Sequence, residues 1–292
     1  MSLNIAYSPR KDDLFYPCKN AQFFPAGAPQ AESALCVELA RMAYCRNDAS
    51  LALNRSRISD ELARIGFTAD GFFESSGTPQ SRGTHCFLAL RQDRQLGVVA
   101  FRGTDKDDPS DVADDINALP APWAAGGKVH RGFAGALADV RSEVERALQP
   151  LQCRLLFTGH SLGAALATLL AGVRAPAALY TFGSPLVGDS DFVATLSGVK
   201  SYRYVDCTDI VTRIPPEILG YRHLGRPYYI AQDRSISFDP GESFIRKDRT
   251  EAFLEYPLKY EPWRKENVAV RELADHAPVN YVSAVTAAPP PA

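Results

Sequence analysis

Hydrophobic residues recur along this chain with two different periods. Apolar residues of the segment Glu32–Arg46 return every three or four positions, as on one face of a helix. The apolar runs Cys86–Arg91 and Leu96–Phe101 flank four polar residues, which is typical of two strands joined by a hairpin turn. We therefore expect an amphipathic helix followed by a strand pair in the first third of the chain.

Beyond residue 130 the chain alternates between strand-like and helical segments. Such alternation predicts crossover connections and an α/β fold, with a mostly parallel central sheet and helices on both faces. The charged segment Asp233–Asp275 fits neither period, so we expect an irregular excursion there. Residues 1–292 are interpreted as a single domain, with the Pro-rich residues 287–292 as a disordered tail. The predicted elements are helix Phe133–Leu148, strand Arg154–Thr158, a helix from Ser161, strand Ala178–Phe182, helix Asp191–Leu196, strand Ser201–Val205 and helix Val279–Thr286.

The sharpest chemical signal is a Gly-x-Ser-x-Gly motif within Leu155–Gly163, between an apolar strand and an Ala/Leu-rich helix. In this context the serine stands on a sharp strand-to-helix turn, the nucleophile elbow of α/β-hydrolases. Gly159 and Gly163 remove side chains that would clash with the neighbouring backbone. The helix N-terminus favours the negative charge that develops during acyl transfer. A serine that merely caps the helix is the alternative, but the flanking elements favour Ser161 as a nucleophile.

A serine nucleophile needs a base, and the base needs a carboxylate that orients it. In this fold the chain order is Ser, Asp or Glu, His, and only His223 and His276 follow Ser161. His276 stands just before the last predicted helix, where the base is expected. We therefore assign His276 and interpret His223 as a buried structural histidine. Asp206 and Asp209 both follow the same predicted strand, and spacing alone does not separate them.

Composition narrows the range of partners and compartments. A formal net charge of -2 gives no pull toward nucleic acid or an anionic membrane, so we expect no nucleic-acid partner. The longest apolar stretch, Leu162–Val173, is well short of the ~20 residues that span a bilayer. No apolar region follows Met1, which favours a cytoplasmic location, whereas a leader ahead of this sequence would direct secretion and permit disulfides. The six cysteines form no Cys-x-x-Cys pair, so we expect reduced, packed thiols and no zinc site.

Seven stretches together resemble the class 3 lipases, the family of fungal triacylglycerol lipases and related feruloyl esterases. They occur in the family's order and extend roughly from Phe101 to Tyr281. Each is weak alone, but seven in order are highly specific. The stretches are Val98–Thr104, Val129–Phe133, Thr158–Ala167, Thr181–Pro185, Asp209–Pro216, Gly220–His223 and Asp275–His276.

The resemblance implies roles that spacing leaves open. The family's catalytic aspartate opens an Asp-Ile-Val-Pro stretch, which falls on Asp209, although Thr212 stands here in place of the proline. The family's oxyanion hole falls on the backbone N–H groups of Thr104 and Leu162. His160 matches a structural position, and so does the histidine at position 130.

The resemblance also implies an activity. We expect a serine hydrolase that cleaves carboxylic esters of neutral lipids or short-chain acyl esters through an acyl-enzyme. Ser161, Asp209 and His276 would form its triad, which requires neither a metal ion nor an organic cofactor. Its partner is then an ester or lipid substrate. Phospholipase or acyltransferase activity on the same triad is the alternative, and the intact triad argues against a non-catalytic binding scaffold.

In this family the segment after the oxyanion strand, here residues 105–122, forms a lid over the site. Six aspartates crowd into its first eleven residues. Val112, Ile116 and Leu119 recur at helical spacing and leave one thin apolar stripe. The acidic run is either a solvated face without function or a lid poorly suited to anionic surfaces. The second interpretation favours soluble short-chain esters, with transient lipid contact through the lid.

We predict no sharp rise in hydrolysis rate as tributyrin passes its solubility limit. Lid opening at a lipid surface gains ~25 cal/mol per Å² of transferred apolar area, and the stripe of three side chains is narrow. Initial rates against tributyrin concentration, on neutral and anionic interfaces, measure the effect. An upward break on both interfaces would mean that the thin stripe suffices.

Overall fold

The computed structural model describes residues 5–20, 22–47, 52–75, 83–104 and 119–288. The predicted lid, residues 105–122, and the predicted tail, residues 287–292, therefore lie mostly outside the described residues. In the described end of the lid segment, Leu119 is 45% exposed. The strand β4 (Pro120–Pro122) then pairs antiparallel with β5 (Lys128–His130), which leads into the next helix.

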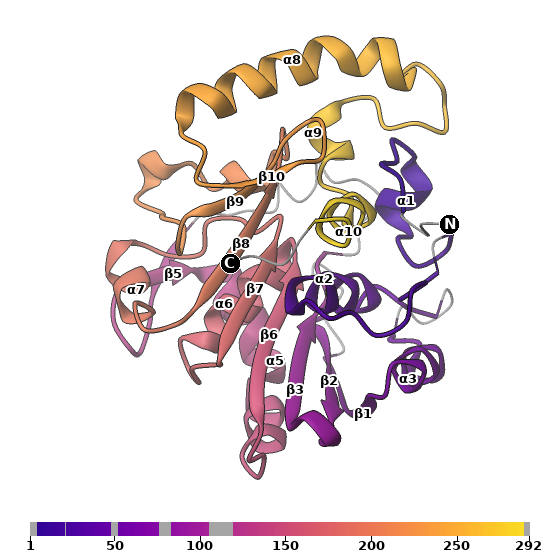
Figure 1. The fold of residues 1–292 in the computed structure, drawn as a ribbon. Coiled ribbons are helices and arrows are strands. Elements are labelled where there is room, and N and C mark those ends of the chain that lie inside the picture. The colour runs from indigo at the N-terminus through magenta and orange to yellow at the C-terminus, as the bar shows by residue number, and fades with distance from the viewer. Residues whose placement is uncertain (1–4, 21, 48–51, 76–82, 105–118, 289–292) are drawn as a thin grey trace.

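The large sheet has the strand order β1-β2-β3-β6-β7-β8-β9-β10. The inner strands β3, β6, β7, β8 and β9 run parallel to one another, and β1, β2 and β10 add antiparallel edges (Figure 1). This mixed, mostly parallel sheet is the α/β-hydrolase fold, which confirms the predicted fold class. The strands are β1 (Thr68–Glu74), β2 (His85–Arg91), β3 (Leu96–Phe101), β6 (Arg154–His160), β7 (Ala178–Phe182), β8 (Ser201–Asp206), β9 (Pro227–Ile230) and β10 (Ile236–Phe238).

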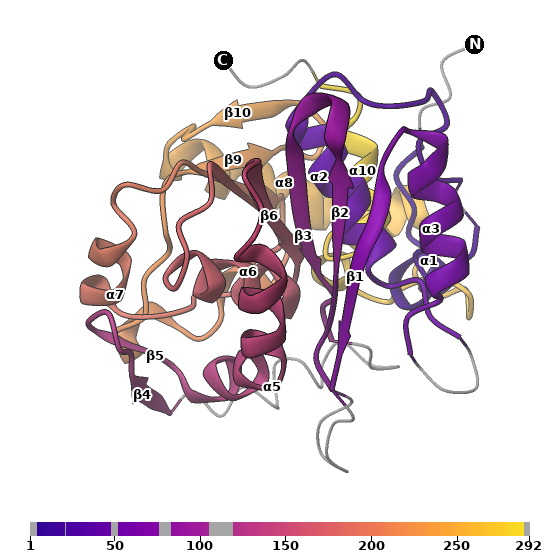
Figure 2. The same cartoon turned by 90° about the horizontal axis from the view of Figure 1, so that it is seen from below.

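Helices cover both faces of this sheet. Helices α2 and α10 lie on one face, and α5 and α6 lie on the other (Figures 1 and 2). Because side chains alternate along a strand, Val98 and Ala100 of β3 pack toward α2, whereas Val99 and Phe101 pack toward α6. The helices are α1 (Lys11–Phe15), α2 (Glu32–Met42), α3 (Arg55–Arg64), α5 (Arg131–Leu148), α6 (Leu162–Ala171), α7 (Ser190–Thr195), α8 (Glu242–Tyr260), α9 (Arg271–Ala274) and α10 (Pro278–Val285).

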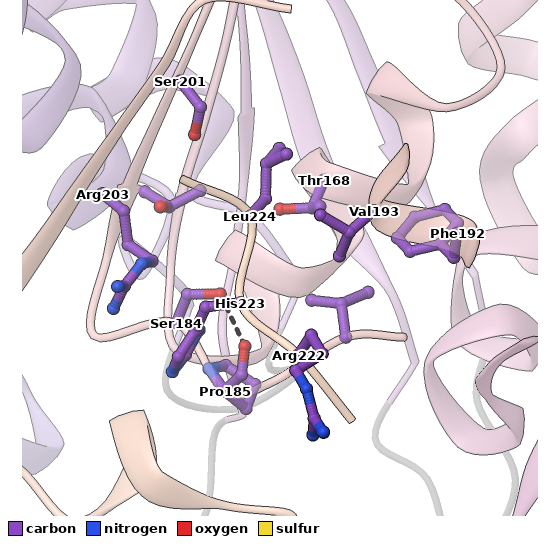
Figure 3. Close-up of a pocket in the computed structure, with 12 residues that line it drawn as sticks. Thr168, Ser184, Pro185, Phe192, Val193, Ser201, Arg203, Arg222, His223 and Leu224 are labelled. Atoms are coloured by element: carbon purple, nitrogen blue, oxygen red, sulfur yellow. Dashed lines mark hydrogen bonds between the residues drawn. The ribbon is translucent and has the colours of Figure 1, made fainter. Parts of the chain in front are cut away.

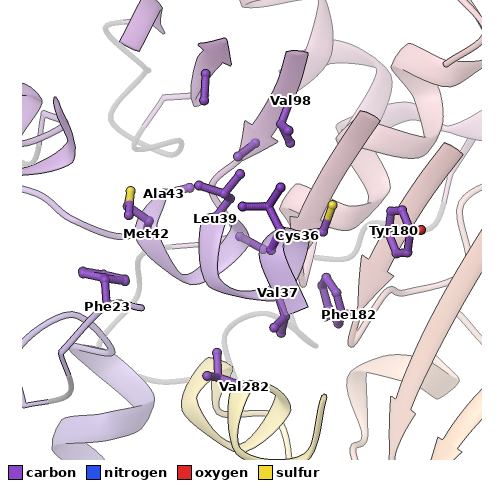
Figure 4. Close-up of a cluster of buried hydrophobic side chains, with 14 of the residues drawn as sticks. Phe23, Cys36, Val37, Leu39, Met42, Ala43, Val98, Tyr180, Phe182 and Val282 are labelled. Carbon is purple, nitrogen blue, oxygen red and sulfur yellow. The ribbon is translucent and has the colours of Figure 1, made fainter. Parts of the chain in front are cut away.

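The core between α2, α10 and the sheet is formed by interleaved apolar side chains. Leu39 and Val37 of α2 lie near Val98 of β3 and Phe182 of β7, with Val282 of α10 on the far side of α2 (Figure 4). These side chains are at most 2% exposed. The packing holds α2 and α10, which flank the loops that carry the candidate site, against the sheet.

The predicted strands and helices are found with small shifts at their ends. Strands β3 and β7 begin and end at the predicted residues, and α5 begins two residues earlier than predicted, at Arg131. The prediction of an irregular excursion at residues 233–275 is wrong, because α8 extends from Glu242 to Tyr260. Its periodicity is hidden because it buries only Asp248, Ala252 and Tyr256, while charged and apolar residues share its exposed sides.

A buried ion pair fastens the N-terminal segment to α2. The Arg41 guanidinium lies 2.7 Å from the Glu38 carboxylate, and both side chains are almost completely buried. Arg41 also donates to the carbonyl oxygens of Pro17 and Gln22 at 2.8 and 3.1 Å. Glu38 in turn accepts from the backbone N–H of Phe24 at 3.3 Å. The pair thereby satisfies backbone groups that the first residues of the chain would otherwise bury unpaired.

We predict that Glu38→Ala lowers the free energy of unfolding by about 3–5 kcal/mol, because Arg41 would remain buried without its counter-charge. Urea denaturation followed by circular dichroism measures the loss. Glu145→Ala is the matched control, since Glu145 forms a surface pair with Arg141 in which both side chains are more than a third exposed, and its loss should cost about 1 kcal/mol or less. Equal losses in the two variants would contradict the prediction.

Candidate active site

The backbone at Ser161 has the strained geometry expected of a nucleophile elbow. Strand β6 ends at His160 and α6 begins at Leu162, which leaves Ser161 alone in the turn. Ser161 has φ 58° and ψ -131°, a backbone conformation that residues other than glycine rarely adopt. Its N–H donates to the carbonyl oxygen of Phe182 on β7 at 3.0 Å. This bond holds the turn at the carboxyl end of the sheet.

Two glycines allow the turn to close. A Cβ at Gly159 would lie 2.2 Å from the backbone of Gly163, and a Cβ at Gly163 would lie 2.3 Å from the carbonyl oxygen of Phe101. Real Cβ atoms are not found at such separations, so larger residues would force the segments apart. The motif glycines are therefore explained by the close approach of α6 to the ends of β6 and β3.

His276 lies between Ser161 and Asp209, in one hydrogen-bonded row. It occupies the turn between α9 and α10, and its Nε2 is 2.9 Å from Ser161 Oγ. Its Nδ1 is 3.0 and 2.9 Å from the two carboxylate oxygens of Asp209. Because a carboxylate only accepts, Nδ1 carries the proton and Nε2 is free to accept from the serine hydroxyl. This is the tautomer that a Ser-His-Asp triad needs.

Asp209 is held by contacts that sequence reasoning did not find. Its Oδ1 accepts from the backbone N–H of Val211 at 2.9 Å, and its Oδ2 accepts from the Tyr281 hydroxyl at 2.6 Å. Gly183 has φ +60°, and a Cβ there would lie 2.9 Å from Asp209 Oδ2 and 3.1 Å from His276 Nδ1. No motif marks Tyr281, since a tyrosine in an apolar helix is most often a core residue.

The other candidate acid, Asp206, is turned toward a different partner. Both of its carboxylate oxygens accept from the Arg234 guanidinium, at 2.9 and 2.8 Å. Burial raises the pKa of Asp206 above its ordinary value, and the charge of Arg234 opposes that rise. The structure thus brings Asp209, and not Asp206, onto the imidazole of His276.

The aspartate that precedes His276 anchors the histidine loop. Asp275 Oδ2 accepts from the Thr208 hydroxyl at 2.8 Å and from Arg271 Nε at 3.2 Å. Its Oδ1 accepts from the Tyr7 hydroxyl at 2.8 Å. Since Thr208 lies next to Asp209, Asp275 ties the loop that carries His276 to the loop that carries Asp209.

The two expected oxyanion donors lie at the end of a strand and at the start of the neighbouring helix. Thr104 follows β3 and is partly buried, and Leu162 is the first residue of α6. A first helical residue has no acceptor within its own helix for its N–H. The tight contact between Gly163 and Phe101 brings the start of α6 against the end of β3. An oxyanion hole made by Thr104 and Leu162 remains a proposal.

The remaining candidate histidines bind backbone groups. His223 Nε2 donates to the Thr212 carbonyl oxygen at 2.8 Å, and burial lowers its pKa to about 3. His130 Nδ1 accepts from the Phe133 N–H at 3.3 Å, and burial lowers its pKa to about 4. Both rings are therefore neutral at physiological pH, and each forms a hydrogen bond with a backbone group. Among the described residues no cluster of three His, Cys, Asp or Glu side chains could hold a metal ion.

A small cavity lies beside β8, lined by Arg203, Ser184, His223 and Arg222 among others (Figure 3). Its volume of ≈10 Å³ has room for about one water molecule. None of Ser161, Asp209 and His276 lines it, so it is not a substrate pocket.

Within the described ranges, no helix is long and apolar enough to cross a bilayer.

Comparisons with known proteins give this geometry a family. A family model described as Lipase (class 3) matches residues 98–219. The secreted mono- and diacylglycerol lipase MDL3 of Malassezia globosa is 30% identical over 232 residues, which cover 71% of this chain and 72% of that relative. The chain belongs to the class 3 lipase family. Thr104, Ser161 and Asp209 lie within the matched residues, and His276 lies beyond them.

Two further similarities concern length and fold. The secreted mono- and diacylglycerol lipase 1 of Fusarium solani is 36% identical over 160 residues, or 51% of this chain, and the chain spans about half (48%) of that relative. The crystal structure of a mono- and diacylglycerol lipase from Aspergillus oryzae superposes with a TM-score of 0.60 and 26% identity, covering 73% of this chain and 87% of that one. The class 3 lipase fold of this chain is therefore close to that of a solved relative.

We predict that Asp209→Asn lowers any ester hydrolysis by this member of the class 3 lipase family by about 10⁴-fold in kcat, because the amide would favour the wrong imidazole tautomer. Asp206→Asn is the matched control: it should weaken the contact with Arg234 and lower the melting temperature, but leave kcat of the folded enzyme within about tenfold. Hydrolysis of p-nitrophenyl butyrate, with folding checked by circular dichroism, measures both. A larger kcat loss in Asp206→Asn would mean that the carboxylate was chosen wrongly.

Proposed function

We propose that this chain is a carboxylic ester hydrolase that cleaves acylglycerol or short-chain acyl esters with Ser161 as its nucleophile. The observation that carries the proposal is the row in which His276 Nε2 lies 2.9 Å from Ser161 Oγ while Nδ1 faces Asp209. Membership of the class 3 lipase family supports it. The strained serine at the start of a helix, which favours developing negative charge, supports it further.

In the proposed first half-reaction, Ser161 Oγ attacks the acyl carbonyl carbon and its proton passes to His276 Nε2. Asp209 stabilises the imidazolium, and the N–H groups of Thr104 and Leu162 hold the oxyanion, each worth roughly 3 kcal/mol in the transition state. The bond to the leaving alcohol then breaks. His276 returns the proton to that alcohol, and the acyl group remains on the serine.

In the second half-reaction water attacks the acyl-enzyme. His276 takes a proton from the water, a tetrahedral intermediate forms again, and its collapse releases the carboxylic acid. Ser161 recovers its proton from the imidazolium. The free enzyme is regenerated, and the net reaction is ester plus water to acid plus alcohol.

The proposed substrate class rests on the relatives. MDL3 of Malassezia globosa and the structural relative from Aspergillus oryzae are both described as mono- and diacylglycerol lipases. An acylglycerol ester is therefore the first substrate to test, and transient contact with a lipid surface through residues 105–122 belongs to the same proposal. A series of p-nitrophenyl esters from acetate to palmitate would define the preferred chain length.

We predict that Ser161→Ala abolishes ester hydrolysis, and labelling by a fluorophosphonate probe, in a protein that still folds. Loss of the nucleophile costs about 10⁶-fold in a serine triad. Ser33→Ala is the matched control, since Ser33 is a buried serine on α2 and its loss should leave both readouts unchanged. Retention of more than about 1% of wild-type kcat by purified Ser161→Ala would contradict the proposed function.

A further inference from the structure

A second hydrogen-bonded chain reaches His276 from behind the elbow. The Tyr44 hydroxyl, just after α2, lies 2.8 Å from Nδ1 of His160. Nε2 of His160 lies 2.8 Å from the backbone carbonyl oxygen of His276. Gly103 lies directly beside the Tyr44 hydroxyl. These four residues come from four different segments of the chain, and we call Gly103, Tyr44, His160 and His276 the relay.

The direction of each hydrogen bond in the relay is fixed. A carbonyl oxygen only accepts, so His160 Nε2 carries the proton and donates to His276. Nδ1 of His160 must then accept, and the Tyr44 O–H donates to it. The Tyr44 hydroxyl and both ring nitrogens of His160 therefore have partners in a single arrangement, which favours a rigid geometry.

The relay is also sterically closed. A Cβ at Gly103 would lie 2.0 Å from the Tyr44 hydroxyl oxygen and 2.7 Å from the carbonyl oxygen of His160. Only glycine fits here. The backbone turn at Gly103, just before Thr104, therefore packs directly against Tyr44 and the end of β6. The His160 ring also lies beside the His276 ring, with 4.6 Å between centroids.

We infer that Tyr44 and His160 are positioning residues, which hold the His276 loop and the Gly103–Thr104 corner in register around Ser161. The inference rests on the proposed function, because it assigns no chemistry of its own. Neither side chain contacts the reacting atoms in the proposed mechanism. Their effect is on the distance from His276 Nε2 to Ser161 Oγ and on the place of the proposed oxyanion donor, and a shift of ~1 Å in such groups costs about 10²-fold in rate.

His160 suits this position because it stays neutral. Burial lowers its pKa well below the ordinary value, and the neighbouring His276 lowers it further. During turnover His276 becomes positively charged, so a second charged ring beside it would oppose the reaction. A neutral His160 instead presents a fixed N–H to the His276 carbonyl at every stage of the cycle.

The test is the steady-state hydrolysis of p-nitrophenyl butyrate by Tyr44→Phe, which removes one oxygen atom and keeps the ring. We expect kcat and kcat/KM to fall together by about 10- to 100-fold, with KM within about twofold, because the loss is confined to the transition state. Tyr256→Phe is the matched control. Tyr256 is also buried and donates to a backbone carbonyl, that of Val268 at 2.8 Å, but it belongs to α8.

A purely structural tyrosine would give a different result. Both variants should melt at a lower temperature than the unchanged protein. Rates are therefore measured well below the lower of the two melting temperatures. If Tyr44→Phe loses no more kcat than Tyr256→Phe, or if its loss lies in KM alone, the relay is overturned.

A rescue experiment tests His160 independently. A glutamine at this position still offers an N–H toward the His276 carbonyl and an oxygen acceptor, whereas a leucine offers neither. We expect kcat of His160→Gln to exceed that of His160→Leu by about tenfold or more. Equal kcat values for the two folded variants would reject the relay. An inactive Ser161→Ala together with a fully active Tyr44→Phe would reject the relay while the proposed function stands, whereas an active Ser161→Ala would reject both.

Discussion

The close approach of three backbone segments around Ser161 is the constraint on which the rest of this structure depends. The end of β6, the start of α6 and the end of β3 meet at separations that Gly159 and Gly163 permit and a Cβ would not. A non-glycine residue at positive φ costs about 1–3 kcal/mol and persists only where its surroundings fix it. Here the fixing comes from the buried, apolar α6 and from the backbone bond between Ser161 and Phe182. The fold thus stabilises a geometry that the local chain disfavours.

Two hydrogen-bonded chains converge on His276, and each controls a different part of it. The row from Ser161 to Asp209 sets the direction of the imidazole and its tautomer. The relay through Tyr44 and His160 binds the backbone carbonyl of His276 and so sets the position of its backbone. If only the ring were hydrogen-bonded, movement of the backbone could still shift the imidazole. Because the backbone carbonyl is hydrogen-bonded as well, the position of Nε2 is fixed from both ends of the residue. In the proposed mechanism this arrangement keeps His276 at one fixed distance from Ser161.

Three carboxylates are fully buried near this histidine, and each has its own set of partners. Asp206 faces Arg234, Asp275 faces Arg271, and Asp209 faces His276. A buried charge without a partner is costly, so the two arginines keep their aspartates away from the imidazole. This division explains why neighbouring acids that look equivalent along the chain are not equivalent in the fold.

The sequence by itself determined the order of strands and helices around the elbow and the place of Ser161, because both follow from short-range periodicity and from glycines within a few residues. It also limited the base to His223 or His276, since only these histidines follow the serine. The tertiary structure decided the rest. The helix α8 escaped notice because its few buried residues leave no apolar stripe. The contact between Asp209 and His276 joins residues 67 positions apart, and that between Tyr44 and His160 joins residues 116 apart. Such contacts depend on how loops meet at one edge of a sheet, and no local pattern of amino acids records that meeting.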